Sequence, residues 1–169
     1  TKTDGTLWNW GQNYSGEMGI SDRVDRSSPT QLPGTLWNKV ASLNITRFAT
    51  KTDGTLWSWG YQTSGQSGLN DRVPRSSPVQ IPGTTWNEID GGLGVIWATK
   101  TDGTLWAWGS DYHGKIGNNA VGHRSSPTQI PGTQWNKITT GSNWGFASKT
   151  DGTLWAWGKN DNGQLGLND

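Results

Sequence analysis

The ten-residue stretch KTDGTLWxWG occurs four times in this chain, and this repetition constrains the fold more than any other feature. The copies begin at Lys2, Lys51, Lys100 and Lys149, so each step is 49 residues and no insertion disturbs the period. We interpret the chain as one repeat array, 1–169, with repeats 2–50, 51–99 and 100–148 and a partial repeat 149–169. Periods of about 40–50 residues are typical of propellers and of helical arrays.

The local pattern favours a propeller. No segment has the i, i+3, i+4, i+7 apolar spacing of a helix, and Gly and Pro interrupt the chain too often for long helices. Each repeat instead indicates four short strands, such as TLWNKVAS (35–42), RFATK (47–51), TLWSW (55–59) and SSPVQIPG (76–83). TDG predicts a tight hairpin turn, and the prolines of the fourth strand suit a sheet edge. The fold class is therefore an all-β propeller of four-stranded antiparallel blades, with about three and a half blades in this chain.

Tryptophan supplies the predicted core, because the chain contains 13 Trp while Leu, Ile and Val are sparse. Side chains alternate between the faces of a strand, so Trp8 and Trp10 share one face, while Leu7 and the small Asn9 share the other. Such a strand fits between two neighbouring blades, where each buried ring contributes roughly 4–6 kcal/mol before entropy is subtracted. We expect eleven recurring residues to form this core: Trp8, Trp10, Trp37, Trp57, Trp59, Trp86, Trp106, Trp108, Trp135, Trp155 and Trp157.

Composition excludes several classes of function. The net charge of +1 gives no electrostatic footprint for nucleic acid or an anionic membrane. There is no Cys, so disulfide and thiolate chemistry are excluded, and no apolar run approaches the ~18 residues that would span a bilayer. The chain starts inside a repeat without Met, which we interpret as a processed chain or a piece of a longer one.

WGKNDNGQLGLND (157–169) extends the repeated motif to DGxLWxWGxNxxGQLGL, which resembles the regulator of chromosome condensation repeats. The resemblance covers the whole chain and implies a seven-bladed propeller, with Gly163 and Gly166 in tight turns. The second strand of that family usually starts with GxxHT, whereas the His position here holds Thr46, Val95 and Trp144.

The activities of that family are diverse, so the resemblance does not fix the function. They include guanine-nucleotide exchange on chromatin, inhibition of β-lactamases and ultraviolet photoreception by a Trp cluster. The near-zero net charge disfavours chromatin binding, and no position matches a motif specific to exchange activity. A photoreceptor would need Arg beside its ring cluster, and packing already explains the repeated rings.

No constellation of residues indicates catalysis, a metal or a cofactor. The four repeated aspartates are explained by the hairpin turns, and His113 and His123 lack the partners of a zinc site. Asn160–Gly163 resembles a calcium loop only weakly, because the D-x-D-x-D-G run and the closing Glu are missing. Asn13 and Asn44 lie in glycosylation sequons that matter only on a eukaryotic secretory route. We therefore expect no enzyme.

Two windows vary between copies that are otherwise nearly identical. One is the hairpin before the second strand, at 43–47, 92–96 and 141–145, and the other is the loop after the Trp strand. Drift in solvated loops explains such variation, and so does binding by variable loops on a rigid scaffold. On the second interpretation, the candidate ligand-binding residues are Trp144, Asn143, Tyr14, Tyr61, Tyr112, His113 and Arg47.

An open array of three and a half blades would expose the large faces of its end blades to water. Two copies hold 338 residues, about 6.9 repeats, so a homodimer would nearly complete seven blades. Each copy brings four Trp strands but only three complete sets, so closing one ring would displace a duplicate strand. A larger assembly, an open head-to-tail stack and a cropped piece of a longer propeller are the alternatives.

Three functions follow in order of preference. The first is a non-catalytic module outside the cytoplasm, on a cell or virion surface, that self-associates and presents its loops to a protein or glycan. The second is a purely structural repeat protein, natural or engineered, or a fragment of a longer propeller. A guanine-nucleotide exchange factor comes last, because no residue set for it can be named.

Overall fold

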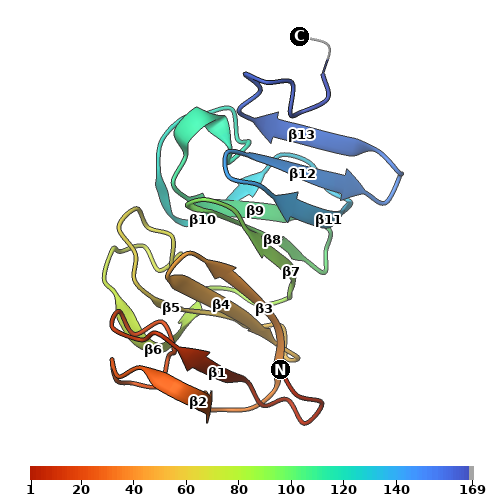
Figure 1. Ribbon diagram of the computed structural model, residues 1–169. Helices are drawn as coiled ribbons and strands as arrows, with labels where there is room; N and C mark the ends of the chain where they lie inside the picture. The colour runs from red at the N-terminus through yellow and green to blue at the C-terminus, as the bar shows by residue number, and fades with distance from the viewer. Residues whose placement is uncertain (168–169) are drawn as a thin grey trace.

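The computed structural model describes residues 1–167 and consists of antiparallel sheets that follow one another along the chain. The first sheet pairs β1 with β2, the second has the order β3-β4-β5-β6, the third β10-β9-β8-β7 and the fourth β11-β12-β13. We call these sheets blades 1 to 4. Figure 1 shows them as an open arc with the two termini at opposite ends. The bounds are β1 Trp8–Gly11, β2 Arg26–Gln31, β3 Trp37–Leu43, β4 Thr46–Lys51, β5 Leu56–Gly60, β6 Arg75–Ile81, β7 Trp86–Gly91, β8 Val95–Lys100, β9 Leu105–Gly109, β10 Arg124–Ile130, β11 Trp135–Thr140, β12 Trp144–Lys149 and β13 Leu154–Gly158.

The predicted blade is confirmed in the two complete sheets. The Pro-containing strands β6 and β10 lie at the edges of these sheets, where a missing N–H costs no ladder hydrogen bond. The TDG turn is built as expected: Asp53 Oδ1 accepts hydrogen bonds from the Thr55 N–H at 2.9 Å and the Thr55 hydroxyl at 2.7 Å. Gly54 has φ +78°, which glycine adopts without steric cost.

The repeated Lys and Thr of this motif position its first Trp. The Thr55 hydroxyl accepts a 2.8 Å hydrogen bond from Trp57 Nε1. Lys51 Nζ lies 4.6 Å from the ring centre of Trp37 and 4.7 Å from that of Trp57, which places the cation over two ring faces. Equivalent contacts recur in blades 3 and 4. The motif is therefore a local unit of turn, strand and cation–π contact.

The core lies between consecutive blades. Leu7 and Leu32 of blade 1 pack with Trp37 and Trp59 of blade 2, and the pattern recurs at the next two junctions. One face of each blade thus carries Leu and small residues, and it covers the Trp face of the following blade. Trp59 Nε1 also donates a 2.9 Å hydrogen bond to the Glu17 carbonyl oxygen of blade 1. The predicted division of the third strand into two faces is confirmed.

Two of the eleven predicted core tryptophans are wrong for the described chain. Trp10 is 62% exposed, although its equivalents Trp59 and Trp108 are 3% and 0% exposed. Within residues 1–167, blade 1 is the first sheet, so no Leu face covers Trp10. Trp155 is 49% exposed because β13 is the last strand of the three-stranded blade 4. Five of the others are buried: Trp37, Trp59, Trp86, Trp108 and Trp135; Trp8, Trp57, Trp106 and Trp157 are half-buried.

Candidate binding cleft

Antiparallel pairing brings the two variable windows to the same end of each blade. The β3–β4 hairpin and the end of β5 are joined by two hydrogen bonds: Tyr61 N–H donates to the Ile45 carbonyl oxygen at 3.1 Å, and the Thr46 hydroxyl donates to the Tyr61 carbonyl oxygen at 2.6 Å. The first of these contacts recurs in blades 3 and 4. The windows that differ most between repeats therefore form one continuous surface.

A cleft of about 250 Å³ opens on this surface, and we call it the hairpin cleft. It lies among the hairpins of blades 2, 3 and 4 and the loops that follow β5 and β9. Neutral amide and hydroxyl side chains make up much of its wall, and two Tyr rings stand in it. Its lining includes Asn44, Tyr61, Ser110, Tyr112, Lys115 and Asn143.

The hairpin cleft unites three of the seven predicted ligand-binding residues, namely Tyr61, Tyr112 and Asn143. Tyr61 is 40% exposed and Tyr112 is 61% exposed, so both rings face solvent. Tyr14 is 58% exposed in the loop of blade 1 and does not line this cleft. His113 follows Tyr112 in the chain but also lies outside the lining.

Arg47 occupies a different cavity, of about 250 Å³, at the beginning of the arc. This cavity is lined by residues of blades 1 and 2, including Trp8, Trp10 and Phe48. Burial lowers the pKa of the Arg47 guanidinium, and the nearby Glu17 carboxylate opposes that shift. Arg47 is therefore separate from the Tyr pair with which the sequence analysis grouped it.

Trp144 belongs to a blade face and not to the variable loop surface. It begins β12 at the repeat position of Val95, which is buried in the core between blades 3 and 4. Its ring contacts Phe146 at a centroid distance of 5.2 Å, in an edge-to-face arrangement. We predicted that Trp144 lies with the tyrosines on the loop surface, and this placement is wrong. Its position in β12 turns the ring toward the face where a next blade would pack.

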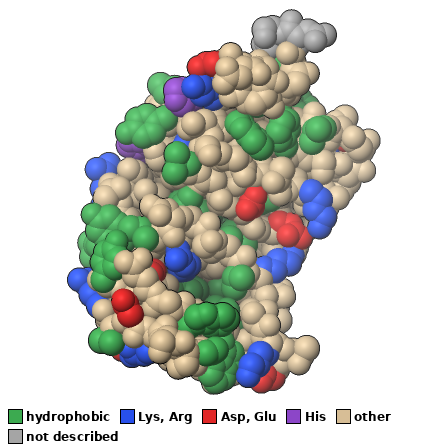
Figure 2. Space-filling model, in the orientation of Figure 1, with side chains coloured by type: hydrophobic (Ala, Val, Ile, Leu, Met, Phe, Trp, Pro, Cys, Tyr) green, Lys and Arg blue, Asp and Glu red, His purple; other side chains and the backbone are tan. Residues whose placement is uncertain are grey.

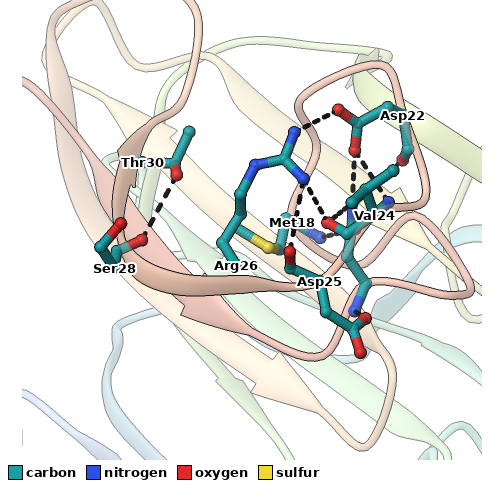
Figure 3. A network of polar contacts seen from close by, with 8 residues as sticks. Met18, Asp22, Val24, Asp25, Arg26, Ser28 and Thr30 are labelled. Carbon is teal, nitrogen blue, oxygen red and sulfur yellow. Dashed lines mark hydrogen bonds and ion pairs between the residues drawn. The ribbon is translucent and has the colours of Figure 1, made fainter.

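Each loop that follows a Trp strand is held by one polar residue, which is buried in blades 1 to 3 and half-buried in blade 4. Asn13 Oδ1 accepts the Met18 N–H at 2.8 Å, and Gln62 and Asn160 accept the N–H five residues later in the same way. Figure 3 shows the rest of this loop in blade 1, where Arg26 reaches the Asp22 carboxylate. The corresponding pair in blade 2 is Arg75 with Asp71, at 2.7 Å.

A second side chain supports the tip of these loops. Glu17 Oε2 accepts the Ser15 N–H at 2.8 Å, and Gln66 Oε1 accepts the Ser64 N–H at 2.7 Å. Gln164 does the same for Asn162 in the last loop, at 2.8 Å. In blades 1, 2 and 4, the side chain four residues after this Asn or Gln thus accepts the N–H two residues before it.

Blade 3 differs, because it has Lys115 at this position and an ammonium group cannot accept a hydrogen bond. The loop instead forms a short 3₁₀ turn, η1 (Tyr112–Gly114), and His113 takes a left-handed φ of +68°. Lys115 points inward and is 2% exposed. Its Nζ donates to the carbonyl oxygen of Leu93 and, at 3.4 Å, to that of Ser142. Lys115 thus links the hairpins of blades 3 and 4.

The surroundings of Lys115 are electrostatically unusual. Burial lowers the pKa of its ammonium, while the charge of Asp111 opposes that shift. Asp111 Oδ1 accepts the Ile116 N–H at 3.0 Å, but the buried Oδ2 has no hydrogen-bond partner. The position of Asp22 and Asp71 holds Ala120 here. Sequence reasoning missed Lys115, although comparing Glu17, Gln66 and Gln164 with it would have shown the departure.

Among the described residues, no cluster of three or more His, Cys, Asp or Glu side chains is placed to hold a metal ion. No helix within residues 1–167 is long and apolar enough to cross a membrane.

Comparison with known proteins was made by family model, by sequence and by structure. The model of the regulator of chromosome condensation (RCC1) repeat matches residues 4–44, 53–90, 102–147 and 151–169. No curated protein sequence matches the chain. The structure of human WBSCR16 aligns with a TM-score of 0.84 at 25% identity, over 99% of this chain and 46% of that one.

Other solved structures share the fold at lower identity. Prp20p of Saccharomyces cerevisiae aligns with a TM-score of 0.80 at 17% identity, over 99% of this chain and 44% of that one. It is described with its binding properties to Gsp1p and histones, and yeast Prp20 is also described bound to Kap60. The computationally designed Ika4 protein aligns with a TM-score of 0.54 at 13% identity, over 92% and 80% of the two chains. The chain thus spans less than half the length of WBSCR16 and Prp20p.

Proposed function

Because the chain belongs to the regulator of chromosome condensation (RCC1) repeat family, we propose that it is a non-catalytic propeller module that associates with a second copy and presents its loops to a ligand. Propellers of this family are generally binding or exchange-factor modules. Prp20p, which shares the fold, is described as binding proteins. We place this module outside the cytoplasm, on a cell or virion surface, as its composition without Cys allows.

The observation that supports self-association is the complementarity of the two ends of the arc. The N-end face is the Trp face of blade 1, where Trp10 is 62% exposed and Trp8 is half-buried. The C-end face is the Leu face of blade 4, where Leu154 is 68% exposed although its equivalents Leu56 and Leu105 are fully buried. Figure 2 shows hydrophobic side chains gathered over β1 at the lower end. Inside the chain, the Leu face of one blade covers the Trp face of the next. The two ends therefore carry the two surfaces that pack together at each junction.

The energy of covering these faces favours association. An exposed fraction of 62% leaves roughly 150 Å² of the Trp10 ring in water, so its burial contributes about 3–4 kcal/mol before the costs of association. A contact between unlike faces is heterologous, and two such contacts in a dimer close a ring. Both ends carry a Trp strand, β1 and β13, so the closed ring displaces one of them.

Light scattering at increasing protein concentration tests this proposal. We expect a particle of twice 18.4 kDa, and we expect the double variant Trp10→Ser and Leu154→Ser to lower its fraction. Val73→Thr is the matched control, because Val73 is 53% exposed but lies in the loop of blade 2, away from both end faces. A folded monomer at every concentration, up to the solubility limit, would refute self-association.

The hairpin cleft favours a second function, which is glycan binding by the variable loops. Tyr61 and Tyr112 are exposed aromatic residues of the kind that pack against the C–H groups of a sugar, and Asn44, Ser110 and Asn143 offer hydrogen-bond groups for hydroxyls. Other repeats show which substitutions the fold accepts: Tyr61→Gln copies Gln12, and Tyr112→Thr copies Thr63.

We expect chemical-shift changes in cleft residues when oligosaccharides are added, and we expect both variants to weaken them. Trp144→Ala is a control for this experiment, because Trp144 lies on the C-end face. If no neutral or acidic oligosaccharide shifts a cleft resonance, glycan binding by this cleft is wrong.

A further inference from the structure

Departures from the repeat pattern are concentrated beside the hairpin cleft. Lys115 replaces the loop acceptor, His113 adopts a left-handed φ, and Asp111 keeps a buried oxygen without a partner. Natural chains tolerate such local strain and unsatisfied polarity mainly at functional sites. Since blades 1 and 2 build the same loop without these features, the fold itself does not require them.

The charge of the cleft comes from one residue. Among its described lining residues, Lys115 is the only one with a charged side chain, and the others are apolar, amide, hydroxyl or phenol groups. Asp111 is the acid that interacts with the Lys115 charge, but it does not line the cleft. The Lys115 ammonium therefore favours an anionic group inside the cleft, while the nearby Asp111 carboxylate offsets part of that attraction.

The two hydrogen bonds of the buried Lys115 ammonium leave its third donor without a hydrogen-bond partner among the described residues. An ammonium has three donors, and two of them point to the carbonyl oxygens of Leu93 and Ser142. The contact with Ser142 is 3.4 Å long, so a carboxylate oxygen can replace it with a shorter, charge-assisted hydrogen bond. Asn143 follows Ser142 in the chain and also lines the cleft.

We propose that the hairpin cleft binds an acidic sugar, with the carboxylate of a uronic acid on Lys115 Nζ and the sugar ring against Tyr61 or Tyr112. This inference rests on the proposed glycan binding and names its chemical class. The volume of about 250 Å³ suits one or two sugar rings. The other polar lining residues are neutral groups that both donate and accept hydrogen bonds. They favour a ligand with one carboxylate and several hydroxyls over a polyanion.

Titration calorimetry with digalacturonic acid and with its methyl ester tests the proposal on the wild-type chain. The ester keeps the sugar and removes the charge. We expect the acid to bind at least about tenfold more tightly than the ester, because a charge-assisted hydrogen bond is lost. Equal binding of acid and ester would overturn the acidic-sugar inference and leave glycan binding intact. If neither binds, both this inference and glycan binding by the cleft are overturned.

Two variants test whether Lys115 supplies the charge that binds the carboxylate. Lys115→Gln restores the residue of the equivalent positions Gln66 and Gln164, so the loop regains its acceptor. We expect this variant to lose about tenfold in affinity for the acid and to bind the ester unchanged. Lys137→Gln is the matched control, since Lys137 is 70% exposed in its side chain and lies outside the cleft. An equal loss in the control would assign the effect to net charge and refute the role of Lys115.

Discussion

Gly68→Ala tests how strongly the loop of one blade is fitted to the tryptophan of the next. A Cβ on Gly68 would lie 2.8 Å from Trp108 Nε1, closer than real Cβ atoms approach, and 3.1 Å from Cε2, which is a tight contact. The Trp108 ring is fully buried, and its Nε1 donates a 2.8 Å hydrogen bond to the Gln66 carbonyl oxygen. The indole therefore cannot retreat without losing that bond and repacking the junction between blades 2 and 3.

Gly166 provides the matched control, because it occupies the same loop position two repeats later. Its φ is +70° and that of Gly68 is +74°, but nothing lies within 4 Å of a Cβ on Gly166. Both Ala variants bear the cost of a left-handed residue, about 1–2 kcal/mol. Only Gly68→Ala adds overpacking, about 1–3 kcal/mol.

Urea unfolding, followed by tryptophan fluorescence and by far-UV circular dichroism, gives the two free energies of unfolding. We expect Gly68→Ala to be the less stable variant by the overpacking cost, which lowers Tm by roughly 2–12 °C for a chain of this size. Equal free energies of unfolding for the two variants would refute the argument that loop and indole are closely fitted.

Two further predictions concern charge. The pKa of Asp53 and of Asp102 is lowered from 3.8 by hydrogen bonds from the following Thr, so their contribution to stability is present above pH 3.8 and is lost as pH falls below it. Replacing both by Asn should make the free energy of unfolding fall less steeply as pH decreases below 4. An unchanged slope would contradict this prediction. Glu88 accepts hydrogen bonds from Lys39 at 2.9 Å and Lys137 at 3.3 Å. Because the groups are partly exposed, Glu88→Gln should cost less than about 1 kcal/mol at low salt and nearly nothing in 1 M NaCl; a loss that salt leaves unchanged would show that packing, not charge, is responsible.

The local structure of each blade could be predicted from the sequence. Alternation in TLWSW places Trp57 and Trp59 on one face, the Asp-Gly pair fixes the hairpin, and proline confines the fourth strand to an edge. All three depend on residues within a few positions of each other. Because the motif recurs every 49 residues, a prediction that holds for one blade holds for the others.

Proximity of the variable windows could also be predicted, because antiparallel pairing places a hairpin and the end of a neighbouring strand at the same end. This placed Tyr61, Tyr112 and Asn143 in one cleft. The same reasoning failed for Trp144, since a strand residue next to a hairpin turns toward a blade face. It also missed Lys115, whose importance depends on the loss of an acceptor inside a loop.

Which of the equivalent residues are buried depends on contacts between blades and not on local sequence. Trp10 and Trp59 have the same local sequence, but Trp59 is covered by the Leu face of blade 1 and Trp10 is not covered within residues 1–167. Likewise, the inward position of Lys115 depends on carbonyl groups in two other hairpins. The ten-residue motif thus determined the strands and turns. Burial and charge at each copy depend on a neighbouring blade about 49 residues away in the chain, because the hydrophobic contact and the local dielectric belong to the pair of blades.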